Sequence, residues 1–221
     1  MRIIIACFTL IVFCSACHIE QRYVFHRDFS GEFTHILDYS DSEEMIPKED
    51  LTDDGKEHNG FLDSLSRSGI QQELEKMEGI HQINLSEKDA QLSVAVSFDG
   101  IESLNRLLSS EAMSRDDIEQ FCQFTKKGRK IIVDFDTSSL EKKDSDQAET
   151  DSLESAFDMD QSNFDELITY RFSYTFEQGV QSVKGTDATI SEDGKTVTVD
   201  ENLKTMSADD FNPKLVIKLK K

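Results

Sequence analysis

Residues 80–98 read IHQINLSEKDAQLSVAVSF, and this stretch decides the fold class. Residues 91–98 alternate apolar with polar side chains, and residues 80–85 do so except at the adjacent polar pair His81 and Gln82. This alternation is the period of a strand with one buried face. The polar residues Glu87, Lys88 and Asp89 stand between them and have the composition of a turn. The stretch therefore predicts a β-hairpin.

Strand-like segments recur in pairs along the rest of the chain. The other predicted hairpins join residues 21–26 with 32–39, 121–125 with 130–135, and 188–190 with 196–199. We also expect a strand over residues 168–176 that continues through 180–183 past a bend at Gly179. The last strand, residues 215–219, is flanked by lysines that suit an edge strand or one wet face.

Short helical patterns lie between these pairs. The predicted helices cover residues 61–77 (bent, or split in two, at Gly69), 101–108 and 153–167. Strands in adjacent pairs with short helices between them favour an α+β fold: an antiparallel sheet built from successive β-hairpins, with short helices packed on one side.

The division of the chain follows its composition. We expect a signal peptide over residues 1–16 and an N-terminal α+β region over 17–136. Residues 137–152 are polar and acidic without apolar periodicity, which predicts a flexible insert. Residues 153–221 are then a β-rich region that completes the same domain.

The first residues have the order of an export signal. Arg2 is followed by an apolar stretch over residues 3–13, which has the length of a signal-peptide core and is too short to span a bilayer. Ser15 and Ala16 precede Cys17 as in the bacterial lipobox, although Cys14 stands where leucine is usual. We therefore predict Cys17 as a lipid attachment site.

Two alternatives remain open for this segment. Ordinary signal peptidase would cut the same bond, because Cys14 and Ala16 also satisfy its small-x-small rule. An N-terminal strand buried in the core is the third interpretation. Cleavage before Cys17 leaves Cys122 as the one other cysteine; we expect it to be a buried structural thiol between Phe121 and Phe124. If Cys17 were not acylated, a Cys17–Cys122 disulfide would become possible.

The chain is strongly acidic. Its net charge is −20, and removal of residues 1–16 makes it −21 because only Arg2 is lost. Such a charge repels nucleic-acid phosphates and anionic lipids, so we expect no nucleic-acid partner and no binding to a membrane by charge alone. The densest basic segments, residues 126–130 and 218–221, are interpreted as a hairpin turn and a solvated tail.

The sequence contains no pattern typical of a catalytic, cofactor or metal site. Loops that start at Asp50 and Asp158 lack the glycine or the final glutamate of a calcium-binding loop. His26 and His35 could approach each other across the first hairpin, but two histidines without a third ligand make a poor zinc site. We therefore predict no enzyme activity, no cofactor and no metal.

One aromatic stripe has two interpretations. Its members alternate along the strand at 168–176 and share one face: Tyr170, Phe172, Tyr174 and Phe176. The stripe is either part of the core or the lining of a groove for an apolar ligand.

The order of these elements resembles a group of small bacterial envelope lipoproteins, distantly similar to the LppM-like lipoprotein domain. The motifs that carry the resemblance are the lipobox, the turn at Ser30-Gly31, residues 38–40, 74–80, 96–98 and 104–105, and the strand at 170–176 with residues 190–197. The resemblance covers most of residues 17–221. It implies a membrane-anchored envelope protein and supplies no catalytic residues.

These observations predict a membrane-anchored envelope lipoprotein that acts as a binding or structural module and contacts another envelope protein or an apolar ligand. The alternative is a carrier of a lipid or a small apolar ligand. Similarity to known lipoproteins favours the outer membrane, facing the periplasm, because His18 is not the aspartate that favours inner-membrane retention in some bacteria.

Overall fold

Two β-sheets make up most of the structure. The computed structural model describes residues 18–38, 70–88, 91–110, 122–135, 169–206 and 214–221. Within this part of the chain, strands account for 62% and helices for 14%. A seven-stranded sheet has the order β3-β4-β2-β1-β7-β10-β9, and a four-stranded sheet has the order β5-β6-β11-β8.

The bounds of the strands follow the chain. The strands of the larger sheet are β1 (His18–Phe25), β2 (Gly31–Asp38), β3 (Ile80–Lys88), β4 (Gln91–Phe98), β7 (Thr169–Phe176), β9 (Ala188–Ile190) and β10 (Thr196–Asn202). Those of the smaller sheet are β5 (Cys122–Lys127), β6 (Lys130–Phe135), β8 (Val180–Lys184) and β11 (Lys214–Leu219).

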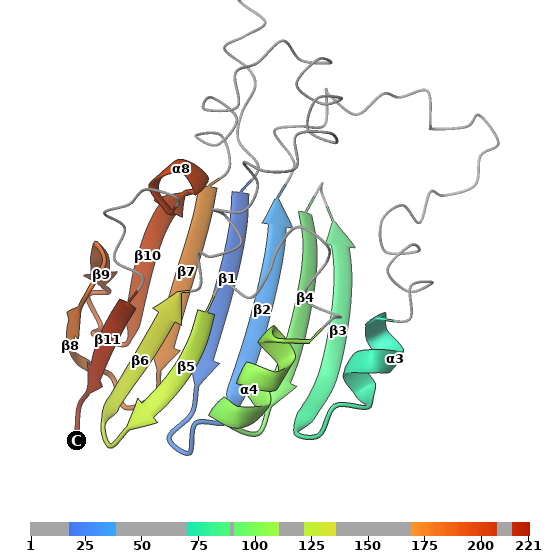
Figure 1. Ribbon diagram of the computed structural model, residues 1–221, viewed down its shortest axis with the longest axis horizontal. Helices are drawn as coiled ribbons and strands as arrows, with labels where there is room; N and C mark the ends of the chain where they lie inside the picture. Colours follow the sequence, from blue (N-terminus) through green and yellow to red (C-terminus); the bar gives the residue numbers. More distant parts are fainter. Residues whose placement is uncertain (1–17, 39–69, 89–90, 111–121, 136–168, 207–213) are drawn as a thin grey trace, which may run out of the picture.

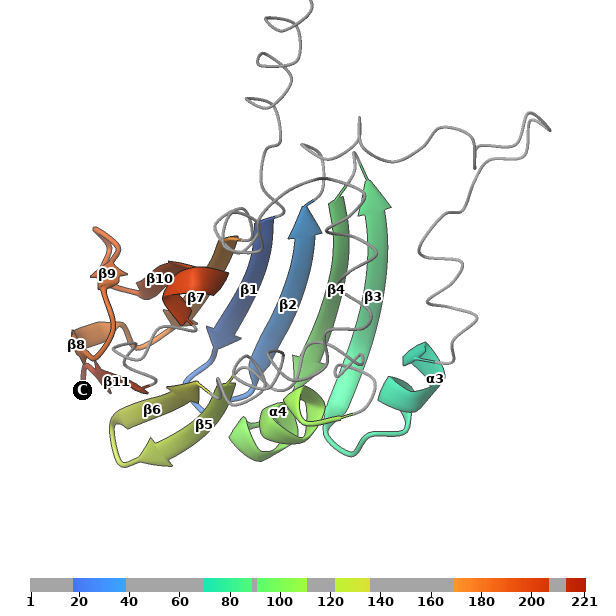
Figure 2. The same cartoon turned by 45° about the horizontal axis from the view of Figure 1, so that its top comes forward.

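The four-stranded sheet lies over one half of the seven-stranded sheet, as Figures 1 and 2 show. Their facing side chains form one hydrophobic core. Ring contacts join the two layers: the Phe124 ring of β5 lies 4.9 Å from that of Tyr23 in β1, and Phe135 of β6 lies 5.2 Å from Phe172 of β7. The fold is therefore a β-sandwich.

Helices have a minor place in the part of the chain that the structure describes. They are α3 (Ile70–Glu75), α4 (Ile101–Leu108) and α8 (Leu203–Met206). Helix α4 covers the larger sheet beside β5 (Figure 2) and buries Leu104 and Leu107 completely. Its bounds match the prediction for residues 101–108.

The predicted α+β fold, with helices packed on one side of an antiparallel sheet, is wrong. A second sheet covers much of the larger one: β5, β6 and β11 turn alternate apolar side chains inward, and β8 joins them with Val180 buried. The larger sheet is also not wholly antiparallel, since β1 and β7 pair in parallel over eight residues. Sequence periodicity locates such strands but does not say which sheet each one joins.

The four predicted hairpins are confirmed by the pairs β1–β2, β3–β4, β5–β6 and β9–β10. The predicted continuation of β7 through residues 180–183 is wrong: after Gly179, whose φ is +78°, the chain crosses to the other sheet as β8. Strand β11 is not an edge strand but lies between β6 and β8. The alternative prediction, that one face of this strand is exposed to solvent, is correct. Leu215, Ile217 and Leu219 point inward, and the lysines lie on the other face.

Several predictions fall outside the described residues. They are the signal peptide and Cys17, the calcium-loop starts at Asp50 and Asp158, the helical pattern before Ile70, the acidic insert at 137–152 and the helix at 153–167.

Candidate functional site

The predicted lipid attachment residue directly precedes the most central part of the larger sheet. Cys17 lies outside the described residues, and β1 begins at the next residue, His18. All eight residues of β1 pair with β2 on one side and with β7 on the other. A group held at Cys17 would therefore be joined to the middle of the sheet without a linker.

The aromatic stripe belongs to the core. Tyr170 is 5% exposed, and Phe172, Tyr174 and Phe176 are fully buried. Phe176 stacks on Phe25 with ring centroids 5.0 Å apart. Of the two interpretations of the stripe, the core is the one that the structure supports.

A short chain of polar groups crosses this core. The Tyr23 hydroxyl donates a hydrogen bond to Gln21 Oε1 at 2.6 Å and lies 3.1 Å from Cys122 Sγ. Because its one proton goes to Gln21, the hydroxyl accepts from the Cys122 thiol. Burial raises the pKa of Cys122 to about 12. Cys122 is thus a buried thiol, as predicted, and stays protonated at neutral pH, so it is a poor nucleophile.

Two buried polar atoms near this chain have no hydrogen-bond partner: Tyr174 Oη and His35 Nδ1. The Tyr174 ring stacks on Tyr23 with centroids 5.2 Å apart. His35 pairs with Gln21 across β1 and β2, so it faces the core. Burial lowers its pKa to about 4, and the imidazole is therefore neutral at physiological pH.

The histidines do not form a metal site in the described part of the chain. His35 lies opposite Gln21, while His26 lies in the turn between β1 and β2. The register therefore separates the two histidines that could have met across the first hairpin. No group of three or more His, Cys, Asp or Glu residues suitable for a metal ion occurs among the described residues.

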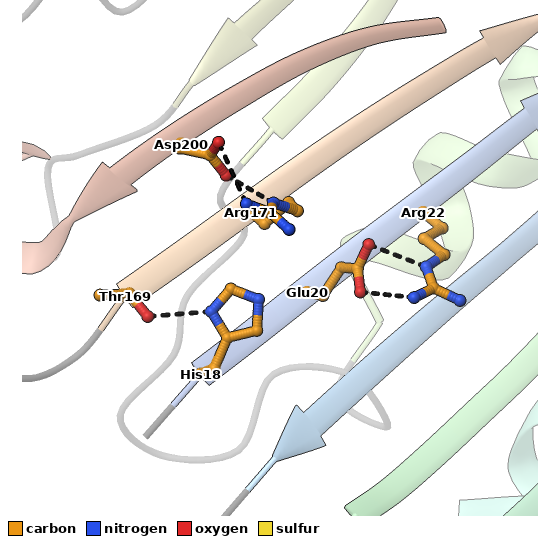
Figure 3. Close-up of polar contacts among 6 residues, drawn as sticks. All are labelled: His18, Glu20, Arg22, Thr169, Arg171 and Asp200. Carbon is orange, nitrogen blue, oxygen red and sulfur yellow. Dashed lines mark hydrogen bonds and ion pairs between the residues drawn. The ribbon is translucent and has the colours of Figure 1, made fainter. Parts of the chain in front are cut away.

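The outer face of the seven-stranded sheet is largely polar, and its two arginines, Arg22 and Arg171, are paired with carboxylates (Figure 3). On β1, Arg22 binds Glu20 through two hydrogen bonds of 2.8 and 2.6 Å. On the neighbouring strands, Arg171 Nε donates to Asp200 Oδ1 at 2.6 Å. At the start of β1, His18 Nδ1 lies 2.9 Å from the Thr169 hydroxyl, so the residue after Cys17 is tied to β7.

A contact that the sequence did not reveal closes one edge of the smaller sheet. Asn105 of α4 donates from Nδ2 to the Phe124 carbonyl at 2.8 Å, and its Oδ1 accepts from the Phe124 amide at 2.9 Å. The side chain thus replaces a neighbouring strand for one residue of β5. Such a clip protects an edge that could otherwise pair with another chain.

Comparisons with known proteins give limited similarity. No family model matches the chain, and no curated protein matches it significantly. Among solved structures, the chain is similar to the folded domain of the LppM protein of Mycobacterium tuberculosis, determined by NMR. The identity is 10%, the TM-score is 0.43, and the match covers 93% of this chain and 90% of that chain. This is a distant similarity of fold, and membership of a family is not shown.

Among the described residues, no helix has both the length and the apolar character needed to cross a membrane.

Proposed function

We propose that this chain is a lipoprotein of the bacterial cell envelope, held to a membrane by acyl chains on Cys17. In this proposal it is a binding or structural module and not an enzyme, it faces the periplasm from the outer membrane, and its partner is another envelope protein. The observation that carries the proposal is the start of β1 at His18, one residue after the lipobox cysteine.

This position gives the anchor a mechanical purpose. The hydrogen bonds of β1 to β2 and β7 run along the whole strand, so a load on Cys17 is shared by both neighbours. A flexible tether would let the domain drift away from the bilayer. Direct attachment to the central strand instead keeps the sandwich itself at the membrane surface.

The distribution of charge explains why a lipid is needed. The described residues contain as many Lys and Arg as Asp and Glu, so the net charge of −20 lies in the remaining residues. The two largest acidic segments, residues 39–69 and 136–168, follow β2 and precede β7 at the end of the sheet where β1 begins. Anionic headgroups would repel these segments, and acyl chains supply the attraction that their charge cannot.

The carrier alternative depended on an open groove along the aromatic stripe. Because Tyr170, Phe172, Tyr174 and Phe176 are buried in the core, the stripe no longer supports that hypothesis.

Metabolic labelling with radioactive palmitate in a bacterial host tests the proposal. We expect label in the wild-type chain and in Cys122→Ala, which removes a cysteine that lies in the core, and no label in Cys17→Ser. An unlabelled wild-type chain, or label that persists in Cys17→Ser, would contradict the proposal.

A further inference from the structure

The fold brings the two basic segments of the sequence together. Lys130 of β6 pairs with Lys218 of β11, and Lys127 of β5 pairs with Lys130. The Leu219 amide also donates to the Arg129 carbonyl at 2.9 Å, which holds the end of β11 against the β5–β6 turn. The turn and the C-terminal segment, which we interpreted separately from the sequence, are therefore parts of one surface.

The three lysines Lys127, Lys130 and Lys218 form a row across the outer face of the four-stranded sheet; we call them the lysine row. Residues directly opposite each other on neighbouring strands share a face and have Cβ atoms about 5 Å apart. Among the described residues, none of the three forms an ion pair, whereas Lys214 on the same face binds Asp134 at 2.7 Å. Like charges at this spacing destabilise a sheet, so the row has an energetic cost within the isolated protein.

The other outer face of the sandwich is different. Glu20 neutralises Arg22 there, and Asp200 neutralises Arg171 (Figure 3). Among the described residues, the arginines of this face are therefore neutralised and the lysine row is not. An arrangement that lowers stability without an internal benefit points to an external partner.

Next to the lysine row lies a row of less polar side chains. Thr125, Ile132 and Val216 are opposite one another on β5, β6 and β11, and all three are half-buried. The surface therefore combines a line of long cationic side chains with a short apolar strip. Lysine stems can lie along apolar surface while their amines reach outward.

We propose that the outer face of the four-stranded sheet docks on a bilayer that contains anionic phospholipids. Three amines in a line are not matched by a single monovalent anion, but a bilayer presents an extended array of phosphates. Ile132 and Val216 then face the boundary between headgroups and acyl chains. A single-stranded nucleic acid fits less well, because no described residue of this face offers the aromatic ring on which a base could stack.

Co-sedimentation with vesicles tests this proposal without the lipid anchor. Residues 17–221 contain every described strand and helix, so this segment is used with Cys17→Ser. The probes are vesicles of phosphatidylcholine alone and vesicles that also contain phosphatidylglycerol. The docking variant is Lys130→Gln/Lys218→Gln, and the matched control is Lys76→Gln/Lys88→Gln, which removes two exposed lysines near β3.

We expect binding to the anionic vesicles alone, weakened by added salt, unchanged in the control and reduced about tenfold or more in the docking variant. The urea midpoint of the docking variant should equal or exceed that of the parent, because a like-charge repulsion is removed. Absence of binding, equal binding to neutral vesicles, or equal loss in the control would overturn the proposal. None of these outcomes bears on the acylation of Cys17, because the tested segment carries Cys17→Ser and cannot be acylated there.

Discussion

Two tyrosines in the core, Tyr23 and Tyr174, differ in the hydrogen bonding of their hydroxyl groups. The rings of Tyr23 and Tyr174 are stacked and fully buried, but only the Tyr23 hydroxyl has hydrogen-bond partners. A buried hydrogen-bonded hydroxyl stabilises a fold, whereas an unpartnered one costs desolvation without compensation.

Removal of each hydroxyl should therefore have a different effect. Tyr23→Phe leaves Gln21 Oε1 without its donor, and we expect it to lower the free energy of unfolding by about 1–3 kcal/mol. Tyr174→Phe should be neutral or stabilising. Urea denaturation of both variants checks this difference, and equal losses of stability would show that the polar chain contributes nothing.

His35 should make stability depend on pH. Its pKa in the folded state is about 4, below the usual 6.5, because burial disfavours the charged ring. Between these values the unfolded chain binds more protons, so the contribution is complete above pH 6.5 and is lost as the pH falls toward 4. From pH 7 to pH 5 we expect a loss of roughly 1–2 kcal/mol, given the partial exposure of the residue.

Urea denaturation at both pH values measures this loss. Over the same interval, His35→Leu should lose less stability than the parent, by about the contribution of His35. A pH dependence that is identical in the parent and in His35→Leu would exclude His35 as its source.

At the scale of elements, Asn105 links a helix to a strand edge. Asn105→Ala removes both hydrogen bonds to the Phe124 backbone and should destabilise the protein by about 1–3 kcal/mol. Hydrogen exchange at the Phe124 amide should become faster. Glu102→Ala, at an exposed position of the same helix, should change neither quantity. Unchanged exchange in Asn105→Ala would mean that the clip does not protect β5.

The elements themselves could largely be predicted from the sequence. Alternation and turn composition are local, and they located the β3–β4 and β9–β10 hairpins and helix α4. Pairings between distant segments could not be predicted. The parallel contact of β1 with β7 joins residues such as His18 and Thr169, and no local pattern reports it. For the same reason the sequence did not show that β8 changes sheets at Gly179.

In the candidate site, too, local features could be predicted from the sequence, whereas contacts between distant segments could not. The burial of Cys122 could be predicted from its apolar neighbours, but its contact with Tyr23 spans 99 positions in the chain. The lysine row likewise combines residues 127, 130 and 218 from three strands, and only the pairing of β6 with β11 brings them together.

At the scale of the whole molecule, the acidic segments and the predicted anchor are joined to the same end of the larger sheet. The net charge of −20 suggested an acidic domain, but the described sandwich is neutral, and the two largest acidic segments adjoin the end where β1 begins. The first residue of β1, His18, directly follows Cys17. An acylated Cys17 would hold the sandwich at the membrane despite the repulsion of the acidic segments.

The intact mass of the protein extracted from host membranes with detergent tests this account most directly. We predict a chain that begins at Cys17, with additional mass that corresponds to a diacylglyceryl group and an acyl group. A chain that begins at Cys17 without this additional mass, or one that retains residues 1–16, would contradict it.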